Sequence, residues 1–90
     1  MKVVISEEAA GDLEHIFVWV AKDDSMAAIQ LLRGIRERVG RLETPGLSHM
    51  GRLGKISGTR ELVESSFVIV YVVGRHEITV LAVFHTSVSI

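Results

Sequence analysis

The side chains best suited to chemistry or to binding a charged partner gather between residues 51 and 85. Arg52 and Lys55 lie in a segment, residues 46–58, that holds four of the chain's eight glycines, and Arg60 follows directly after it. A guanidinium donates paired hydrogen bonds to phosphate or carboxylate and stays charged at any working pH. A flexible backbone carrying these cations could reshape around an anionic partner, although the segment could also be a plain connection.

Two further residues could exchange protons. His85 ends the last predicted strand, and an imidazole titrates near neutral pH. Tyr71 lies within an apolar strand, where a tyrosine usually packs its ring and bonds its hydroxyl to a neighbour. The structural alternative for His85 is a hydrogen bond to nearby backbone. For Arg60 it is an ion pair with Glu61 or Glu64, although strand alternation places Glu61 on the opposite face.

Several classes of site are not supported by the residue spacing. The chain has no cysteine, and its four histidines lack the spacing of a metal site. The Gly51–Gly58 segment lacks the spacing and the Gly-Lys-Ser/Thr ending of a phosphate-binding loop. No Ser/His/Asp set or catalytic carboxylate pair is visible. We therefore expect no metal, no cofactor and no self-contained hydrolase.

Charge is distributed unevenly along a chain whose formal net charge is −1. Residues 1–24 are acidic and residues 33–60 are basic. The basic residues of the second range are Arg33, Arg36, Arg38, Arg41, Arg52, Lys55 and Arg60. Such an asymmetry fits either a solvated helix face or a binding patch.

The elements that must position these residues are indicated by periodicity. A β-branched run at residues 2–5 predicts a strand, and Ser6 is a helix cap. Two apolar stripes at helical spacing follow, separated by Asp23-Asp24-Ser25. Residues 59–63, 67–73 and 77–84 are predicted strands. The order β-α-α-β-β-β predicts an α+β domain, with a helix hairpin on one face of a mainly antiparallel four-stranded sheet.

Ninety residues are expected to form a single domain, 1–90. The N-terminus turns acidic too early for a signal peptide, and the longest apolar run, residues 67–73, is too short to cross a bilayer. A cytoplasmic protein is expected. Trp19 falls about 120° from the apolar stripe of its helix. It is therefore either covered by the second helix or an exposed anchor for a partner, and we favour the anchor.

Taken in order, these segments resemble the ParE/RelE superfamily of bacterial toxins from type II toxin–antitoxin systems, on its ParE-like side. The resemblance spans almost the whole chain. Residues 6–16 are similar to the family's first helix, and residues 28–45 to its second. The most specific part is Gly51-Arg52 followed by Gly58-Thr59-Arg60-Glu61-Leu62. Arg60 matches an arginine shared by both branches, and His85 matches a histidine common at the end of the last strand.

The resemblance implies a small toxin that a cognate antitoxin neutralises by wrapping it with a C-terminal segment. ParE-like members poison DNA gyrase, whereas RelE-like members cut messenger RNA in the ribosomal A site. The family often continues after His85 with arginines and an aromatic residue, and this chain has only residues 86–90 there. We therefore expect a gyrase inhibitor that is not itself an enzyme. The alternatives are a ribosome-dependent endoribonuclease and an inactive homologue that only binds antitoxin.

The resemblance and the charge pattern together assign site residues. The expected target-binding residues are Arg52, Lys55, Arg60 and His85. The expected antitoxin-binding residues are Trp19, Arg33, Arg36 and Arg60. For the endoribonuclease alternative, the catalytic candidates are Arg60, Lys55, His85 and Tyr71. The expected partners are the antitoxin, in a hetero-oligomer, and DNA gyrase, with no membrane and no sequence-specific nucleic-acid binding.

Overall fold

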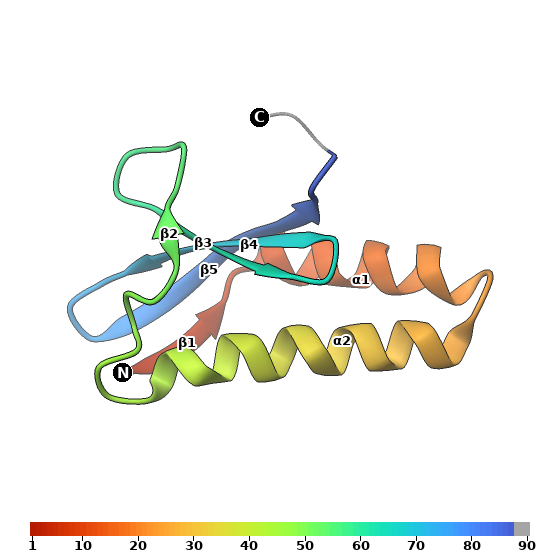
Figure 1. Ribbon diagram of the computed structural model, residues 1–90, viewed down its shortest axis with the longest axis horizontal. Helices are drawn as coiled ribbons and strands as arrows, with labels where there is room; N and C mark the ends of the chain where they lie inside the picture. The colour runs from red at the N-terminus through yellow and green to blue at the C-terminus, as the bar shows by residue number, and fades with distance from the viewer. Residues whose placement is uncertain (88–90) are drawn as a thin grey trace.

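The structure is a computed structural model that describes residues 1–87, so residues 88–90 of the short tail lie outside the described part. It is an α+β fold with a helix hairpin following the first strand, as predicted (Figure 1). Its elements are β1 (Lys2–Ile5), α1 (Glu7–Ala21), α2 (Ser25–Gly40), the short 3-10 helix η1 (Arg41–Glu43), β2 (Arg52–Leu53), β3 (Arg60–Glu64), β4 (Phe67–Val73) and β5 (Glu77–His85).

Five strands form one sheet in the order β1-β5-β4-β3-β2. β1 pairs with β5 in parallel, and the other neighbours are antiparallel. The prediction of four strands was therefore one short. The additional strand, β2, lies in the glycine-rich segment and has only two residues, Arg52 and Leu53, paired with Glu61 and Arg60. Two residues cannot display a hydrophobic period, so the sequence pattern had no means of revealing β2.

Side-chain caps fix where the two helices begin. The Ser6 hydroxyl accepts a hydrogen bond from the Ala9 amide at 3.1 Å, and the Asp24 carboxylate accepts one from the Ala27 amide at 3.0 Å. The Ser6 cap was predicted from residue type and position, and Asp24 belongs to the Asp23-Asp24-Ser25 segment that separates the two predicted helices. The connection between the helices is only residues 22–24, and α1 and α2 run antiparallel to each other (Figure 1).

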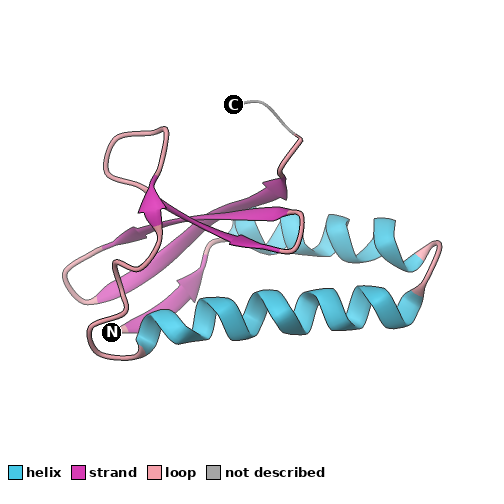
Figure 2. Cartoon of the chain, viewed as in Figure 1, coloured by secondary structure: helices cyan, strands magenta, loops and turns pink. Residues whose placement is uncertain are grey.

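The helix hairpin packs on one face of the sheet, with α1 against β5 and α2 against β3 (Figure 2). Alternation along β4 directs Phe67, Ile69 and Tyr71 into the shared core. From the helices, Ile35, Val39 and Ala9 enter the same core. The loop that joins β2 to β3 projects from the sheet on the side away from α2 (Figure 1).

Within residues 1–87, no helix is both long enough and apolar enough to cross a membrane.

Candidate partner-binding surfaces

Arg60 is bound to the backbone of the segment that precedes β2. Its Nη1 donates to the Gly51 carbonyl at 2.8 Å and to the His49 carbonyl at 3.1 Å. The expected alternative, an ion pair with Glu61 or Glu64, does not form among the described residues. Glu61 lies on the other face of β3, as alternation predicted, and Glu64 is 4.0 Å from Arg38. Arg60 thus keeps its positive charge while its guanidinium holds the loop.

Gly51 is the second fixed point of this loop. Its amide donates to the Tyr71 hydroxyl at 3.0 Å, and both residues are buried. A Cβ on residue 51 would lie 2.7 Å from both the Glu61 carbonyl oxygen and the Tyr71 hydroxyl, so only glycine fits. Tyr71 is 0% exposed, and its hydroxyl accepts the hydrogen bond from the Gly51 amide. Its predicted structural role, a packed ring with a bonded hydroxyl, is the one that the structure shows.

Arg52 is neutralised within the molecule. Its Nε and Nη2 each lie 3.1 Å from Oε1 of Glu61, across the β2–β3 pair. The Glu61 side chain is only 7% exposed, whereas that of Arg52 is 62% exposed. The charge of Arg52 thus compensates a buried carboxylate, and the assignment of Arg52 to target binding stays a prediction. The outer side of the guanidinium still faces solvent.

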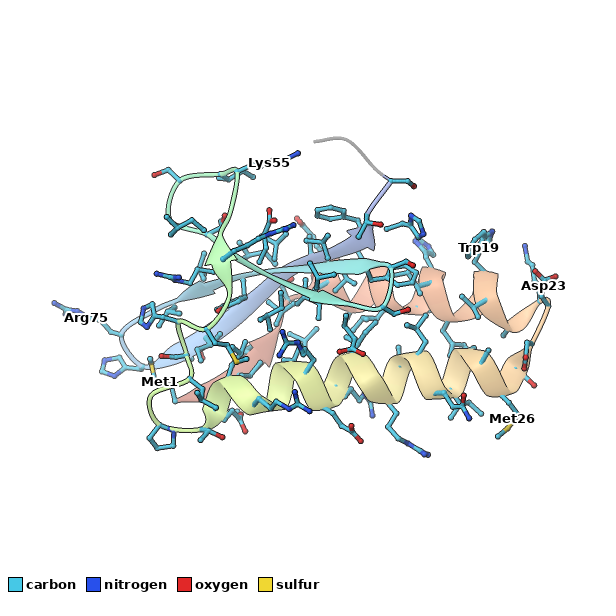
Figure 3. All side chains as sticks on the ribbon, in the orientation of Figure 1. Met1, Trp19, Asp23, Met26, Lys55 and Arg75 are labelled. Atoms are coloured by element: carbon cyan, nitrogen blue, oxygen red, sulfur yellow. The ribbon has the colours of Figure 1, made fainter. Side chains whose placement is uncertain are left out.

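The loop that joins β2 to β3 is closed by hydrogen bonds of Thr59. The Gly54 amide donates to the Thr59 carbonyl at 2.9 Å, and the Thr59 hydroxyl donates to the Ile56 carbonyl at 2.6 Å. Thr59 is buried, whereas Leu53, Lys55 and Ile56 are exposed. Lys55 lies at the far end of the loop (Figure 3), and no ion pair involves it within residues 1–87. Of the three predicted cations in this region, Lys55 is the one for which the described residues provide no partner.

His85 lies at the opposite end of the sheet. Its ring packs edge-on against Phe67, with ring centroids 5.4 Å apart, and its Nδ1 accepts from the Ser87 amide at 3.1 Å. A groove of about 540 Å³ opens beside it, lined also by His15, Ile16 and Trp19. Trp19 is 67% exposed, so α2 does not cover it, and its role as an anchor for a partner stays a prediction. His85 and Trp19, which were assigned to different partners, border one groove.

The four nuclease candidates do not converge. Arg60 is the cross-strand partner of Tyr71, whereas His85 pairs with Phe67, four residues away along β4. At about 3.3 Å per residue, this separation is roughly 13 Å. Tyr71 is buried and Lys55 is at the loop tip. No acid–base pair near a cation cluster arises from this set.

An apolar cleft lies between α1, α2, β1 and β5, and its volume is about 650 Å³. Leu13 and Phe17 of α1 face Leu32 and Ile35 of α2 across it. Its rim carries the charged residues Glu14, Arg36 and Glu43. The cleft continues past Phe17, Leu32 and Arg36 into a shallower hollow of about 280 Å³, which Arg33 also lines.

The cleft was the main feature that sequence reasoning missed. Both apolar stripes were recognised, but no cleft between the two helices was predicted from them. The sequence did contain a signal for the cleft. Phe17 and Leu32 widen the apolar stripes of their helices beyond the residues that face the core. The predicted antitoxin residues are accordingly divided among three places. Arg33 and Arg36 border the cleft and its extension, Trp19 borders the His85 groove, and Arg60 is bound at the β2–β3 end.

Within residues 1–87, no cluster of three or more His, Cys, Asp or Glu side chains could hold a metal ion. The molecule is thus a small α+β protein with candidate binding surfaces, in which Arg52 and Arg60 stabilise the β2–β3 end.

A comparison with models of protein families identifies the family of this chain. The model of the family described as "ParE toxin of type II toxin-antitoxin system, parDE" matches residues 3–89, and the chain belongs to this family.

A solved structure supports the same assignment. The chain resembles one from the structure titled "Chromosomal ParDE TA system from P. aeruginosa", with a TM-score of 0.81 and 25% identity. The likeness covers 94% of this chain and 95% of that one. A search of curated proteins gave no match. The predicted resemblance to the ParE-like branch is thus confirmed.

Proposed function

We propose that this chain inhibits bacterial DNA gyrase in the cytoplasm and that a cognate antitoxin neutralises it. Membership of the ParE toxin family over residues 3–89 carries the proposal. The chain acts by binding and not by catalysis. In support, its candidate acid–base residues are far apart or buried, and its cations hold backbone and carboxylate groups.

The antitoxin binds in the apolar cleft. The cleft and its extension follow α2 from Glu43 towards Ile29, which is the elongated shape that an amphipathic helix needs. The apolar floor would bury one face of that helix. Glu14 and Glu43 would pair with basic residues of the antitoxin, and Arg33 and Arg36 would pair with its acidic residues.

Co-expression with the product of a neighbouring small gene tests the antitoxin site. Leu32→Glu puts a carboxylate into the cleft wall, and this should weaken the complex by about a hundredfold or more. Met26→Glu, on the exposed side of α2, is the matched control and should bind as the parent chain does. Equal binding by Leu32→Glu and the parent chain in isothermal titration calorimetry would exclude the cleft.

A supercoiling assay with purified gyrase tests the target. The chain should inhibit supercoiling and trap a cleaved DNA complex, and adding antitoxin should reverse both effects. Lys55, with the outer face of Arg52, is the expected contact, because these are the exposed positive charges at the β2–β3 end. Unimpaired supercoiling at a large molar excess of toxin would reject gyrase as the target.

Growth of cells that express the chain without antitoxin provides a separate readout. An active toxin arrests growth, whereas an inactive homologue that only binds antitoxin leaves it normal.

A further inference from the structure

Residues 53–56, which we call the tip of the β2–β3 hairpin, combine two large apolar side chains with a single cation: Leu53 ends β2, and Lys55 and Ile56 lie in the loop that follows. Leu53 is 77% exposed, more than any other large hydrophobic residue in the described chain, and Ile56 is 59% exposed. Lys55 lies between them in sequence. Exposed apolar groups are unfavourable in water, so such a tip is typical of a binding element.

The tip is rigidly supported, and this favours binding further. Thr59 closes the loop through the Gly54 amide and the Ile56 carbonyl. At the base of the hairpin, the Arg60 guanidinium donates to the His49 carbonyl, and the Gly51 amide donates to the Tyr71 hydroxyl. Because the loop is already ordered, little conformational entropy is lost when it docks.

We propose that Leu53 and Ile56 insert into an apolar pocket on the protein target of the toxin, with Lys55 pairing to a carboxylate at the rim of that pocket. The proposal rests on the proposed function, since it takes the target to be gyrase. In it, most of the affinity for the target comes from an apolar contact and not from a cationic surface. The expected partner surface is a concave protein pocket lined by aliphatic or aromatic side chains.

The charges at this end of the molecule favour a protein over a nucleic acid. Binding to a phosphate backbone needs several free cations, and binding to single strands usually adds stacking aromatics. Here Arg52 compensates Glu61, and Arg60 is occupied by two carbonyls. The loop between β2 and β3 contains one lysine and no aromatic residue.

The test uses the full chain with Leu53→Gln and Ile56→Thr, alone and combined. Each substitution should weaken gyrase binding and inhibition about tenfold or more, because a buried aliphatic side chain is lost from the contact. Lys55→Gln should have a smaller effect, about threefold. Met26→Gln is the matched control, since Met26 is 61% exposed on α2 and belongs to neither surface.

Two readouts keep this proposal separate from the proposed function. Growth arrest in cells without antitoxin reports on toxicity whatever the target is, and supercoiling reports on gyrase alone. If the parent chain arrests growth without affecting gyrase, the gyrase assignment fails and the tip is still tested by the growth of the variants. If the double variant arrests growth and inhibits gyrase as the parent does, the tip proposal fails and the proposed function stands. A parent chain inactive in both assays overturns both.

Antitoxin binding and thermal unfolding show whether each variant is folded. All variants should retain both, because Leu53, Lys55 and Ile56 are exposed and none of them lines the cleft or its extension. Loss of antitoxin affinity in Leu53→Gln, with an unchanged melting temperature, would assign the tip to the antitoxin and overturn the proposal. The proposal also fails if Lys55→Gln alone abolishes activity and nucleic acid competes in a strongly salt-dependent way.

Discussion

The cleft between the helices and the base of the β2–β3 hairpin are built by different forces. The cleft is walled by aliphatic and aromatic side chains such as Leu13 and Leu32, whose packing has no fixed direction. The hairpin base depends on individual polar contacts between Gly51 and Tyr71, and between Arg52 and Glu61. An apolar wall tolerates change in one residue, whereas a directional contact has no substitute.

This difference indicates how a small toxin can combine an adaptable surface with a fixed one. The walls of the cleft are apolar side chains, and the polar links between its helices and the sheet are few: the Val83 amide donates to the Asp12 carboxylate at 2.9 Å, and Arg38 lies 4.0 Å from Glu64. The hairpin presents its tip in one geometry because Arg60 and Gly51 anchor both sides of its base. Substituting residues in one region and then in the other tests this contrast.

Gly51→Ala should cause the largest loss. The new Cβ would lie 2.7 Å from the Tyr71 hydroxyl and the Glu61 carbonyl oxygen, so the loop must move and the buried hydrogen bond is broken. We expect a loss of about 3 kcal/mol in the free energy of unfolding, measured with urea.

Gly11→Ala is the control for this prediction. Gly11 lies within α1, and a Cβ there meets nothing within 4 Å. Alanine should therefore raise stability by about 0.5–1 kcal/mol through helix propensity. Equal effects of the two substitutions would show that the Gly51 contact is not a fixed point of the fold.

Much of the fold was predictable because its signals are local. Ser6 and Asp24 act as caps through contacts three residues away, and the apolar run of residues 67–73 became β4. The sites were less predictable, because they depend on distant pairings. Arg52 lies opposite Glu61 only once β2 has paired with β3. Trp19 and His85 line one groove, but nothing in the sequence around Trp19 predicts that the two residues lie close together.

Leu13→Ala tests the other region. Leu13 is half-buried in the cleft wall, so we expect a loss of about 1.5 kcal/mol, below that of a fully buried leucine. The transition should remain two-state in urea. Val18→Ala, on the exposed side of the same helix, should change stability by less than about 0.5 kcal/mol. A loss for Leu13→Ala as great as that for Gly51→Ala would remove the distinction between the regions.

Arg52→Gln removes the partner of a buried carboxylate. Glu61 then lacks its charged donor, and we expect a loss of about 1 kcal/mol, at the low end for ion pairs with a buried member because Arg52 is mostly solvated. Lys55→Gln, at the tip of the same hairpin, should leave stability unchanged within about 0.5 kcal/mol. Calorimetric unfolding of both variants compares the two cations. A stable Arg52→Gln variant would mean that the pair does not hold the hairpin base.

Glu43→Gln should have the smallest effect, and it tests whether the cleft also has a directional contact. Oε2 of Glu43 accepts from the Val3 amide at 2.8 Å at the outer edge of β1, and the site is exposed. A glutamine carbonyl can still accept this bond, so we expect a change below about 0.5 kcal/mol. Glu43→Ala leaves the amide to water, and Val3 should then exchange its amide hydrogen faster while the core is unaffected. If Glu43→Ala instead destabilised the whole protein by as much as Arg52→Gln does, the cleft rim would depend on a polar contact just as the hairpin does. The adaptability of the cleft would then have to come from its floor alone.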